Sequence, residues 1–416
     1  MLSANSESIN YFKWEPSRFM NPVPASLAPD TRPTVLVLGM GDTGVLTASH
    51  LSRQCRVIGV TTKPMLVSGQ ELGLRLTAHA QWRLNYLTSL NLYRRLSRVE
   101  IIHGKAVRLD PIARTAALEL ADGEHQRLHW DYLVIATGVS NGFWRDERLD
   151  TGQVVESRLA SQCAAVKAAS SIAVVGAGPS GTSAAFNLKR AHPKKSVTIF
   201  FPGQELLPGY PQGTKNYHRE LLERQGVILH DGHRAVVPGG GVTSGLAGGR
   251  LEFEGGQSSH QADLIIWAAG RLKPHTSFLP QDMLDAAGFV RTDACLNVSG
   301  YARIFAIGDV AATDPLRCSA RNWAYKVLCR NLLASIKQRR LPARFSPPPH
   351  RWGSVVGPQP TGLRLHSPAG KFHTLPRWLV DWFLYPLVVR RFIYGGIRGE
   401  GPRSLANDAL SGKNDG

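Results

Sequence analysis

The chain is poor in closely spaced cysteines. Its 416 residues include five cysteines, and no two of them form a Cys-x-x-Cys or similar pair: Cys55, Cys163, Cys295, Cys318 and Cys329. A disulfide reductase needs two neighbouring thiols, one to attack and one to resolve, and a structural zinc site needs short ligand spacings. The spacing therefore argues against both kinds of site and is typical of scattered thiols in a reducing compartment.

Long apolar runs are absent as well. No stretch of 18 consecutive apolar residues occurs, so a membrane-spanning helix is not expected. The first five residues lack the basic start and apolar core of a secretory signal, and they lack the Met-Gly start that myristoylation requires. We expect a cytoplasmic protein, free or peripheral on a membrane, with residues 1–30 as a flexible lead-in.

Acidic side chains are in the minority. The chain has 49 basic and 31 acidic residues and a formal net charge of +18. Such an excess favours anionic partners such as nucleotides, acidic redox proteins or anionic lipid, and an arginine-rich proteome would produce it too. No nucleic-acid-binding motif accompanies the charge, so a polynucleotide partner is not expected.

Two glycine-rich turns of the same type are the most informative features present. Residues 39–44 read GMGDTG and residues 176–181 read GAGPSG. Each turn follows a short apolar run typical of a strand, at residues 35–38 and 172–175, and precedes a stretch typical of a helix. In this setting G-x-G-x-x-G is the fingerprint of a dinucleotide-binding unit, in which glycines let a pyrophosphate approach the start of the helix. Two fingerprints predict two dinucleotides and electron transfer between them.

The repeat extends beyond the glycines. At a similar distance after each turn, a strand-like run ends in a small residue and glycine, at residues 131–138 (DYLVIATG) and 263–270 (DLIIWAAG). An alternating, strand-like segment precedes each of these runs. Matching order and spacing indicate a duplicated nucleotide-binding unit. A further motif, residues 304–311 (IFAIGDVA), occurs once.

This ordered set resembles the flavoproteins with two dinucleotide-binding domains. Within them the chain most resembles the branch that holds apoptosis-inducing factor, the ferroptosis suppressor protein and type II NADH:quinone oxidoreductases. The resemblance covers residues 33–340 and, more loosely, the chain to about residue 400. It implies an α/β fold of two Rossmann-like domains with FAD and NAD(P)H as cofactors.

The resemblance also implies a division of the chain. An FAD-binding domain would comprise residues 31–149 and 273–345, with an NAD(P)H-binding domain, residues 150–272, inserted into it. Residues 346–416 would form a small C-terminal segment that carries an amphipathic helix and a disordered tail.

The same resemblance assigns cofactor contacts residue by residue. Asp309 would hold the flavin ribityl chain, Val107 would lie on the strand whose backbone contacts the adenine, and Lys63 would lie near FAD phosphate or ribose, although a solvated lysine fits equally. The FAD contacts are Gly39, Gly41, Asp42, Thr43, Gly44, Lys63, Val107, Ala136, Thr137, Gly138, Gly308 and Asp309. The NAD(P)H contacts are Gly176, Gly178, Pro179, Ser180, Gly181, Phe201, Ala269 and Gly270. No catalytic side chain and no metal ligand is assigned.

Three departures from the family pattern stand out. A ribose-binding acid normally ends the second strand of each unit, but here those strands lead to residues 61–63 (TTK) and to Phe201. Loss of the second acid removes the main discrimination against a 2′-phosphate, so NADH and NADPH both stay open as donors. Ser183 stands where relatives commonly have a glutamate near the flavin, which puts the family's proton delivery to a quinone in doubt.

The C-terminal segment is rich in aromatic and basic residues between positions 376 and 394. Such a stretch suits a helix lying in a membrane interface, and it equally suits a helix that packs on the FAD-binding domain or in a homodimer. For the electron acceptor, a quinone is the first hypothesis, because of the family branch and this segment. A small ferredoxin-like iron–sulfur carrier and a slow, redox-sensing flavoprotein are the alternatives.

Overall fold

The computed structural model describes residues 30–141, 145–237, 246–269, 272–313, 324–347 and 353–398. Residues from Pro33 onward form one unit, separate from residues 1–32, and the account below concerns that unit.

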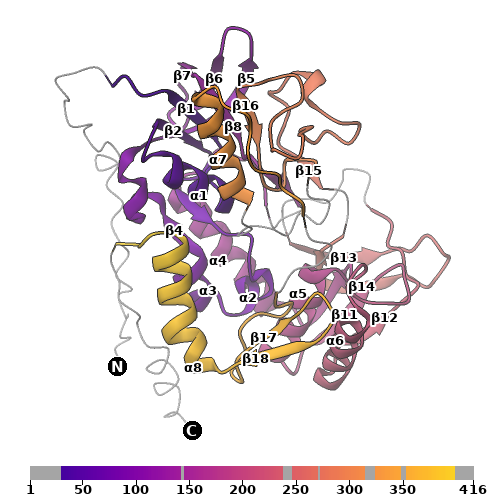
Figure 1. Cartoon of the computed structure of the whole chain (residues 1–416). Helices are drawn as coiled ribbons and strands as arrows, with labels where there is room; N and C mark the ends of the chain where they lie inside the picture. The colour runs from indigo at the N-terminus through magenta and orange to yellow at the C-terminus, as the bar shows by residue number, and fades with distance from the viewer. Residues whose placement is uncertain are drawn as a thin grey trace, which may run out of the picture. The chain divides into compact units, whose positions relative to one another are not determined.

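The first glycine-rich turn follows a central strand of a seven-stranded sheet (Figure 1). The strand order is β16-β8-β1-β2-β5-β6-β7, and the first five of these run parallel. The strands are β1 (Thr34–Leu38), β2 (Arg56–Thr61), β5 (Val99–Asp110), β6 (Thr115–Leu120), β7 (His125–His129), β8 (Tyr132–Ile135) and β16 (Ile304–Ala306). β6 and β7 pair as an antiparallel hairpin. β1 lies between β8 and β2 and is almost wholly buried, as a near-continuous apolar run in a parallel sheet should be.

The second glycine-rich turn follows a strand of a five-stranded sheet with the order β12-β11-β10-β14-β13. Its strands are β10 (Ser171–Val175), β11 (Ser196–Phe200), β12 (Ile228–His230), β13 (Ala247–Leu251) and β14 (His260–Trp267). The parallel triplet β11-β10-β14 repeats the triplet β2-β1-β8 of the first sheet. We call β1, β2 and β8 with residues 39–44 the first repeat, and β10, β11 and β14 with residues 176–181 the second repeat. The predicted α/β class with two Rossmann-like sheets is confirmed.

Helices cover the sheets, and two of them begin at the glycine-rich turns. The helices are α1 (Asp42–Leu51), α2 (Leu72–Thr77), α3 (His79–Tyr86), α4 (Gly152–Ala168), α5 (Pro179–Ala191), α6 (Gln212–Gln225) and α7 (Ala324–Ile336). α1 and α5 begin inside the two turns, and α5 begins with a proline, whose fixed φ suits a first helical position.

Short elements connect these layers. They are β3 (Met65–Val67), β4 (Leu87–Ser89), η2 (Leu90–Leu92), η3 (Arg94–Arg98), β9 (Val139–Ser140), β15 (Lys273–Pro274) and η4 (Gln281–Met283). The chain leaves the first sheet along β9 and returns along β15, which pairs antiparallel with β9. The second sheet is thus inserted between two parts of the first, while the domain boundaries named above stay predictions.

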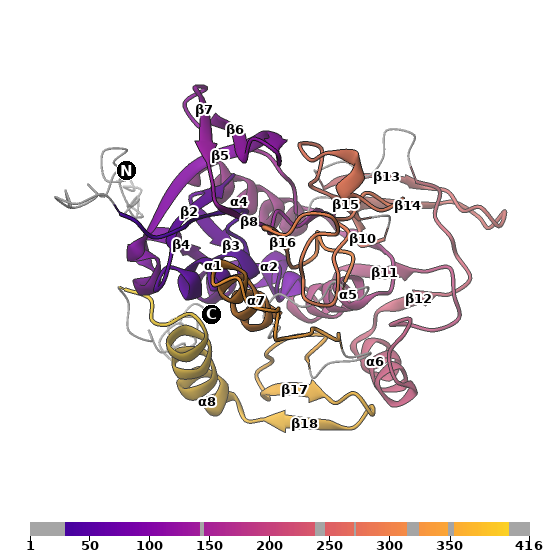
Figure 2. The ribbon, with the colours of Figure 1, turned by 45° about the horizontal axis from the view of Figure 1, so that its top comes forward.

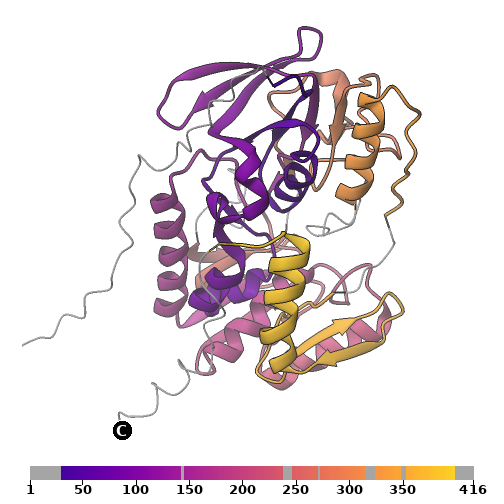
Figure 3. The ribbon, with the colours of Figure 1, turned by 60° about the vertical axis from the view of Figure 1, so that its left-hand side comes forward.

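The C-terminal segment lies beside α6 (Figure 2) and contacts α1 and α5, because the Tyr394 hydroxyl donates to Asp42 and the Asn187 side-chain amide donates to the Val356 carbonyl. Its hairpin of β17 (Leu363–His366) and β18 (Phe372–Leu375) packs on α6, where the Arg364 guanidinium lies 4.5 Å from the ring centre of Tyr217. A single turn, α8 (Arg377–Leu379), continues into a wide π-helix, η5 (Val380–Ile393), drawn in yellow in Figure 3. The hydroxyl of Tyr385 on η5 hydrogen-bonds that of Tyr86 on α3. Within the described ranges, no helix is long and apolar enough to cross a membrane.

Candidate functional site

The first glycine-rich turn has the backbone geometry that a pyrophosphate requires. Gly39 has a φ of +97°, and a Cβ there would overlap the carbonyl of Ala136. A Cβ on Gly41 would meet nothing within 4 Å, so this backbone is open to an approaching group, whereas a Cβ on Gly44 would collide with the Gly39 carbonyl. Tight turn, open approach and close helix packing are the three tasks of the fingerprint glycines. The turn therefore fits a dinucleotide.

The second turn repeats this division of tasks. Gly176 has a φ of +105° and lies against the Ala268 carbonyl, while Gly178 is open within 4 Å and Gly181 packs on the carbonyl of Gly176. The agreement at all three positions shows that both turns are built to hold a pyrophosphate at a helix N-terminus.

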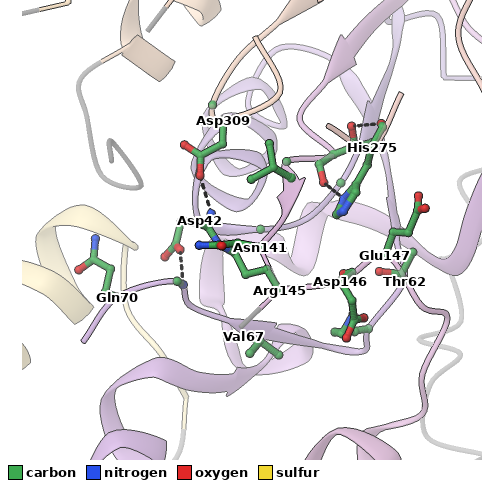
Figure 4. Close-up of a pocket in the computed structure, with 18 of the residues that line it drawn as sticks. Asp42, Thr62, Val67, Gln70, Asn141, Arg145, Asp146, Glu147, His275 and Asp309 are labelled. Atoms are coloured by element: carbon green, nitrogen blue, oxygen red, sulfur yellow. Dashed lines mark hydrogen bonds and ion pairs between the residues drawn. The ribbon is translucent and has the colours of Figure 1, made fainter. Parts of the chain in front are cut away.

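Residues of both turns line one cavity of about 730 Å³. Figure 4 shows some of its lining side chains, among them Asp42 and Asp309. The cavity reaches from the first repeat to the start of α5 in the second repeat, where Ser183 also lines it. Ten of the predicted FAD contacts line it: Gly39, Gly41, Asp42, Thr43, Lys63, Ala136, Thr137, Gly138, Gly308 and Asp309. Three of the predicted NAD(P)H contacts line it: Gly178, Pro179 and Ser180. The cavity therefore joins the two predicted cofactor sites.

The other predicted contacts lie elsewhere. Gly44, Gly176 and Gly181 shape their turns from behind the cavity. Val107 is 42% exposed next to Ala106, which does line the cavity, and Ala269 follows Ala268, which also lines it. Gly270 lies outside the described residues. These assignments stay predictions.

Asp309 directs its carboxylate into the cavity. Its Oδ2 accepts a hydrogen bond of 2.5 Å from Nη1 of Arg145, as Figure 4 shows. The carboxylate is 14% exposed, and the Arg145 side chain is 32% exposed. A hydroxyl of a bound ligand would therefore compete with Arg145 for this acceptor.

Asp42 binds protein groups on several sides. Its carboxylate accepts hydrogen bonds from the Ser68 hydroxyl at 3.0 and 3.1 Å and from the Gly69 amide at 3.3 Å. The hydroxyl of Tyr394, at the end of the C-terminal helix, donates to Asp42 Oδ1 at 2.8 Å. Asp42 thus links the first glycine-rich turn to the C-terminal segment.

Arg75 is a cavity residue that the sequence analysis missed. It lies on α2, lines the cavity and is only 3% exposed. Burial lowers the pKa of Arg75 to about 10, so the guanidinium keeps its charge at neutral pH. Its Nη2 donates to Oε1 of Gln162 at 3.4 Å. A charged residue inside the apolar run LGLRLT is the signal in the sequence that could have marked it.

Lys63 also lines the cavity, but its ammonium faces protein carboxylates. Nζ lies 3.1 Å from Oδ1 of Asp146 and 3.8 Å from Oδ2 of Asp150. Burial alone would raise the pKa of Asp146, but the Lys63 charge and hydrogen bonds from Lys63 and Arg148 lower it to about 2. The contact of Lys63 with FAD stays a prediction. In the structure, Lys63 anchors residues 146–150 to the end of β2.

In the second repeat, the end of β11 corresponds to the end of β2 and carries Phe201 in place of a charged side chain. Phe201, which follows β11, is 2% exposed and packs in the core with Leu206 and Leu207. Its backbone amide donates to the carbonyl of His230 at 3.1 Å, and its carbonyl accepts from the amide of His233 at 2.9 Å. The ring and both backbone polar groups of Phe201 are thus engaged within the protein. Its predicted NAD(P)H contact stays a prediction.

A histidine links the two segments through which the chain leaves the first sheet and returns to it. His275, beside β15, lines the cavity, and its Nδ1 lies 2.9 Å from the carbonyl of Thr137. Its Nε2 lies 2.7 Å from the Ser140 hydroxyl, and its carbonyl accepts from the Thr137 hydroxyl at 2.8 Å. Burial lowers the pKa of His275. The neutral ring, with Nδ1 donating to Thr137 and Nε2 accepting from Ser140, satisfies this network.

Thiols are not part of the cavity wall as far as the structure describes it. Of the four described cysteines, Cys55 and Cys329 are buried and Cys163 and Cys295 are half-buried, and none of these four lines the cavity. Burial raises the pKa of the Cys163 and Cys329 thiols, which favours the unreactive protonated form. Among the described residues there is also no group of three side chains suited to hold a metal ion.

Residues 32–328 match the family described as pyridine nucleotide-disulphide oxidoreductase. The chain belongs to this family. The predicted cofactors, FAD and NAD(P)H, and the predicted class, oxidoreductase, are thereby confirmed.

Curated relatives agree with the predicted branch. Oxidoreductase ptaL of Pestalotiopsis fici is 29% identical over 290 residues, which cover 68% of this chain and 74% of that protein. Oxidoreductase phnG of Penicillium herquei is 29% identical over 51% of this chain and 55% of that protein. Mouse ferroptosis suppressor protein 1 is 26% identical over 58% of this chain and 65% of that protein. The chain therefore spans 55% of the length of phnG and 65% of the length of the mouse protein.

Solved structures show the same fold at low identity. An NAD-dependent persulfide reductase from A. fulgidus has a TM-score of 0.58 and 20% identity, over 77% of this chain and 61% of that chain. A water-forming NADH oxidase from Lactobacillus brevis has a TM-score of 0.56 and 18% identity, over 75% of this chain and 71% of that chain. Both likenesses support the two-sheet architecture.

Proposed function

We propose that the protein takes a hydride from NAD(P)H onto FAD and passes two electrons to a quinone-type acceptor. The observation that carries the proposal is the single cavity that both glycine-rich turns line. Bound FAD supplies the ability to accept a hydride and release its electrons to a second molecule. The net reaction converts NAD(P)H, a quinone and a proton into NAD(P)⁺ and a quinol.

The chain's own residues bind and orient the partners of this reaction. The open backbone at Gly41 and Gly178 admits one pyrophosphate to each repeat, so the reactive rings meet in the shared cavity. The buried charge of Arg75 stabilises negative charge that develops in the cavity on reduction. The Asp309 carboxylate would accept a hydrogen bond from a cofactor hydroxyl in place of the one from Arg145.

The position of the described cysteines supports a small-molecule acceptor over a disulfide. A disulfide reductase needs a reactive thiol at the flavin, and none of the four described cysteines lines the cavity. The branch of the family that the sequence resembles includes quinone reductases, which favours a quinone among small acceptors.

The C-terminal helix supports a membrane as the source of that quinone. Five large apolar side chains on α8 and η5 are between 40% and 68% exposed: Trp378, Trp382, Phe383, Leu387 and Phe392. Apart from the adjacent pair Trp382 and Phe383, they recur every four to five residues. This spacing follows the i→i+5 hydrogen bonding of the π-helix, which the bond from the Tyr394 amide to the Val389 carbonyl shows. They therefore form one stripe, which we call the aromatic stripe, while Val380, Tyr385, Val389 and Tyr394 are buried.

The charges near the aromatic stripe favour an anionic bilayer. Arg391 and Arg398 are exposed on the same segment, and the chain as a whole carries a net charge of +18. Aromatic and apolar side chains beside arginines are typical of a surface that inserts among anionic lipid headgroups. We propose that the stripe docks there, and that residues 353–355 of the same C-terminal segment, which line the cavity, connect it to the site.

The test compares two quinones. NAD(P)H oxidation is measured with a short-chain quinone in solution and with a long-chain quinone in vesicles containing anionic lipid, for the wild type and for a Trp378→Ser, Trp382→Ser double variant. The rate of NAD(P)H oxidation by the double variant should fall about tenfold with the vesicle quinone and stay unchanged with the soluble quinone. Ile112→Ser is the matched control, because Ile112 is 92% exposed and lies on the β5–β6 connection.

Three outcomes would contradict the proposal. Faster reduction of an acidic ferredoxin than of any quinone, abolished by high salt, would assign an iron–sulfur carrier. Slow turnover with every acceptor, with a stable charge-transfer complex, would assign a redox sensor. A stable homodimer that the double variant abolishes would assign the aromatic stripe to a protein interface.

A further inference from the structure

The first repeat lacks an acid at the end of β2, but another segment brings carboxylates to that place. Residues 145–150 follow β9 and run back over the end of β2, where the Asp150 amide donates to the Thr62 carbonyl at 3.0 Å. The Lys63 ammonium donates to the carbonyls of Asp146 and Arg148, both at 3.3 Å. The segment is thus fixed to the strand end where ribose recognition normally takes place.

Asp146 and Glu147 of this segment line the cavity. Hydrogen bonds from protein donors already engage both carboxylate oxygens of Asp146. Asp146 Oδ1 accepts from Lys63 Nζ and from the Arg148 amide, both at 3.1 Å. Its Oδ2 accepts from Nη2 of Arg148 and Nη1 of Arg158, both at 3.0 Å. With four donors on two oxygens and a pKa of about 2, Asp146 holds the segment together and has little capacity for a ligand.

Glu147 is differently placed. It lines the cavity, its side chain is 31% exposed, and its Oε2 lies 3.5 Å from the ammonium of Lys105. Lys105 is on β5, the strand beside β2, and with its neighbour Ala106 it lines the same end of the cavity. Figure 4 labels Thr62, Asp146 and Glu147 together at this end, away from Asp42 and Asp309.

We propose that Glu147 is the carboxylate that accepts the adenosine ribose hydroxyls of FAD. It supplies from a separate segment the group that the end of β2 lacks. A carboxylate oxygen at 3.5 Å from a single ammonium retains lone pairs for two neighbouring hydroxyls. The inference rests on FAD binding in the first repeat, as proposed above, and is independent of the electron acceptor.

The test measures binding of FAD to apoprotein by isothermal titration calorimetry. Glu147→Gln keeps the side-chain shape but removes the charge. It should raise the dissociation constant of FAD about 10- to 100-fold. Glu156→Gln is the control, because Glu156 lies on α4, pairs with Arg83 and does not line the cavity.

A second ligand separates ribose recognition from general damage. An FAD analogue with 2′,3′-dideoxyribose on its adenosine side should bind the wild type as weakly as FAD binds Glu147→Gln. The variant should bind FAD and the analogue alike. An unchanged FAD dissociation constant in Glu147→Gln would overturn the inference, as would an equal loss on removing the hydroxyls in both proteins. If the wild type failed to bind FAD, the proposed function would fall first.

Discussion

The two repeats share their phosphate-binding turns and differ where the ribose should be recognised. Both turns have a first glycine at positive φ, an open second glycine and a third glycine packed on the first. At the end of β2, residues 145–150 supply Asp146 and Glu147 to the cavity, whereas the end of β11 carries the buried ring of Phe201. Phosphate recognition is therefore local to each turn, while ribose recognition depends on what other segments bring.

This difference bears on the choice of donor. A carboxylate after the second strand repels a 2′-phosphate, and Phe201 cannot. The second repeat should therefore accept both NADH and NADPH, whereas the first repeat, with Glu147, should depend on an unmodified ribose.

The largest expected effects come from filling the open glycine in each repeat. Gly41→Val should lower FAD affinity at least about 1,000-fold, because it displaces the pyrophosphate from several charge-assisted hydrogen bonds. Gly178→Val should leave FAD bound and raise the KM for NAD(P)H by a similar factor. Flavin absorbance after gel filtration and steady-state kinetics measure the two losses. Loss of both cofactors in either variant would show that the repeats do not act separately.

Phe201→Ala tests whether this ring is part of the core or of the cofactor site. Truncation of a buried phenylalanine should cost about 4 kcal/mol of unfolding free energy. The ratio of kcat/KM for NADH and NADPH should stay unchanged, because the ring does not line the cavity. Urea unfolding and kinetics on the residual folded protein provide the two readouts. A changed cofactor ratio with unchanged stability would contradict the assignment.

Acid should destabilise the protein first through its buried histidines and later through Asp146. Burial lowers the pKa of His103 and of His275, which lie beside the first repeat. Burial, with nearby His366 and Arg364, lowers the pKa of His218 on α6 to about 4. Because the unfolded state takes up the proton first, stability falls as pH drops from 6.5 to 4, by about 3 kcal/mol in full. Asp146 has a lowered pKa of about 2, so its contribution is lost only from about pH 4 to pH 2.

The measurement follows the free energy of unfolding by urea as the pH is lowered. Stability should fall between pH 6.5 and pH 4, and His218→Phe should remove part of that loss while leaving the later loss below pH 4 unchanged. An early loss that His218→Phe leaves unaltered would contradict this role of His218.

The smallest effect concerns the contact between the first repeat and the C-terminal helix. Tyr394→Phe removes the hydrogen bond to Asp42 and should raise the dissociation constant of FAD about fivefold, equivalent to about 1 kcal/mol. Tyr385→Phe is the control, because its hydroxyl pairs with Tyr86 and Tyr385 does not line the cavity. Equal effects of the two variants would show that the helix acts only through general packing.

Local patterns explain what could be predicted from the sequence. Glycine spacing, apolar strands and the position of Asp309 are properties of short segments, and the structure contains all of them. Arg75 and Glu147 could not be placed in the same way. They reach the cavity through the packing of α2 and of residues 145–150, which no short motif specifies. The aromatic stripe was visible in composition, but its orientation depends on the π-helix, whose spacing differs from that of an α-helix.

The central claim is most directly tested by anaerobic stopped-flow absorbance of the FAD-loaded protein. The protein is mixed with NADH or NADPH and then with a quinone. We predict rapid bleaching of the flavin by both donors at comparable rates, followed by rapid return of the oxidised spectrum with the quinone. A flavin-loaded protein that neither donor bleaches would contradict the account.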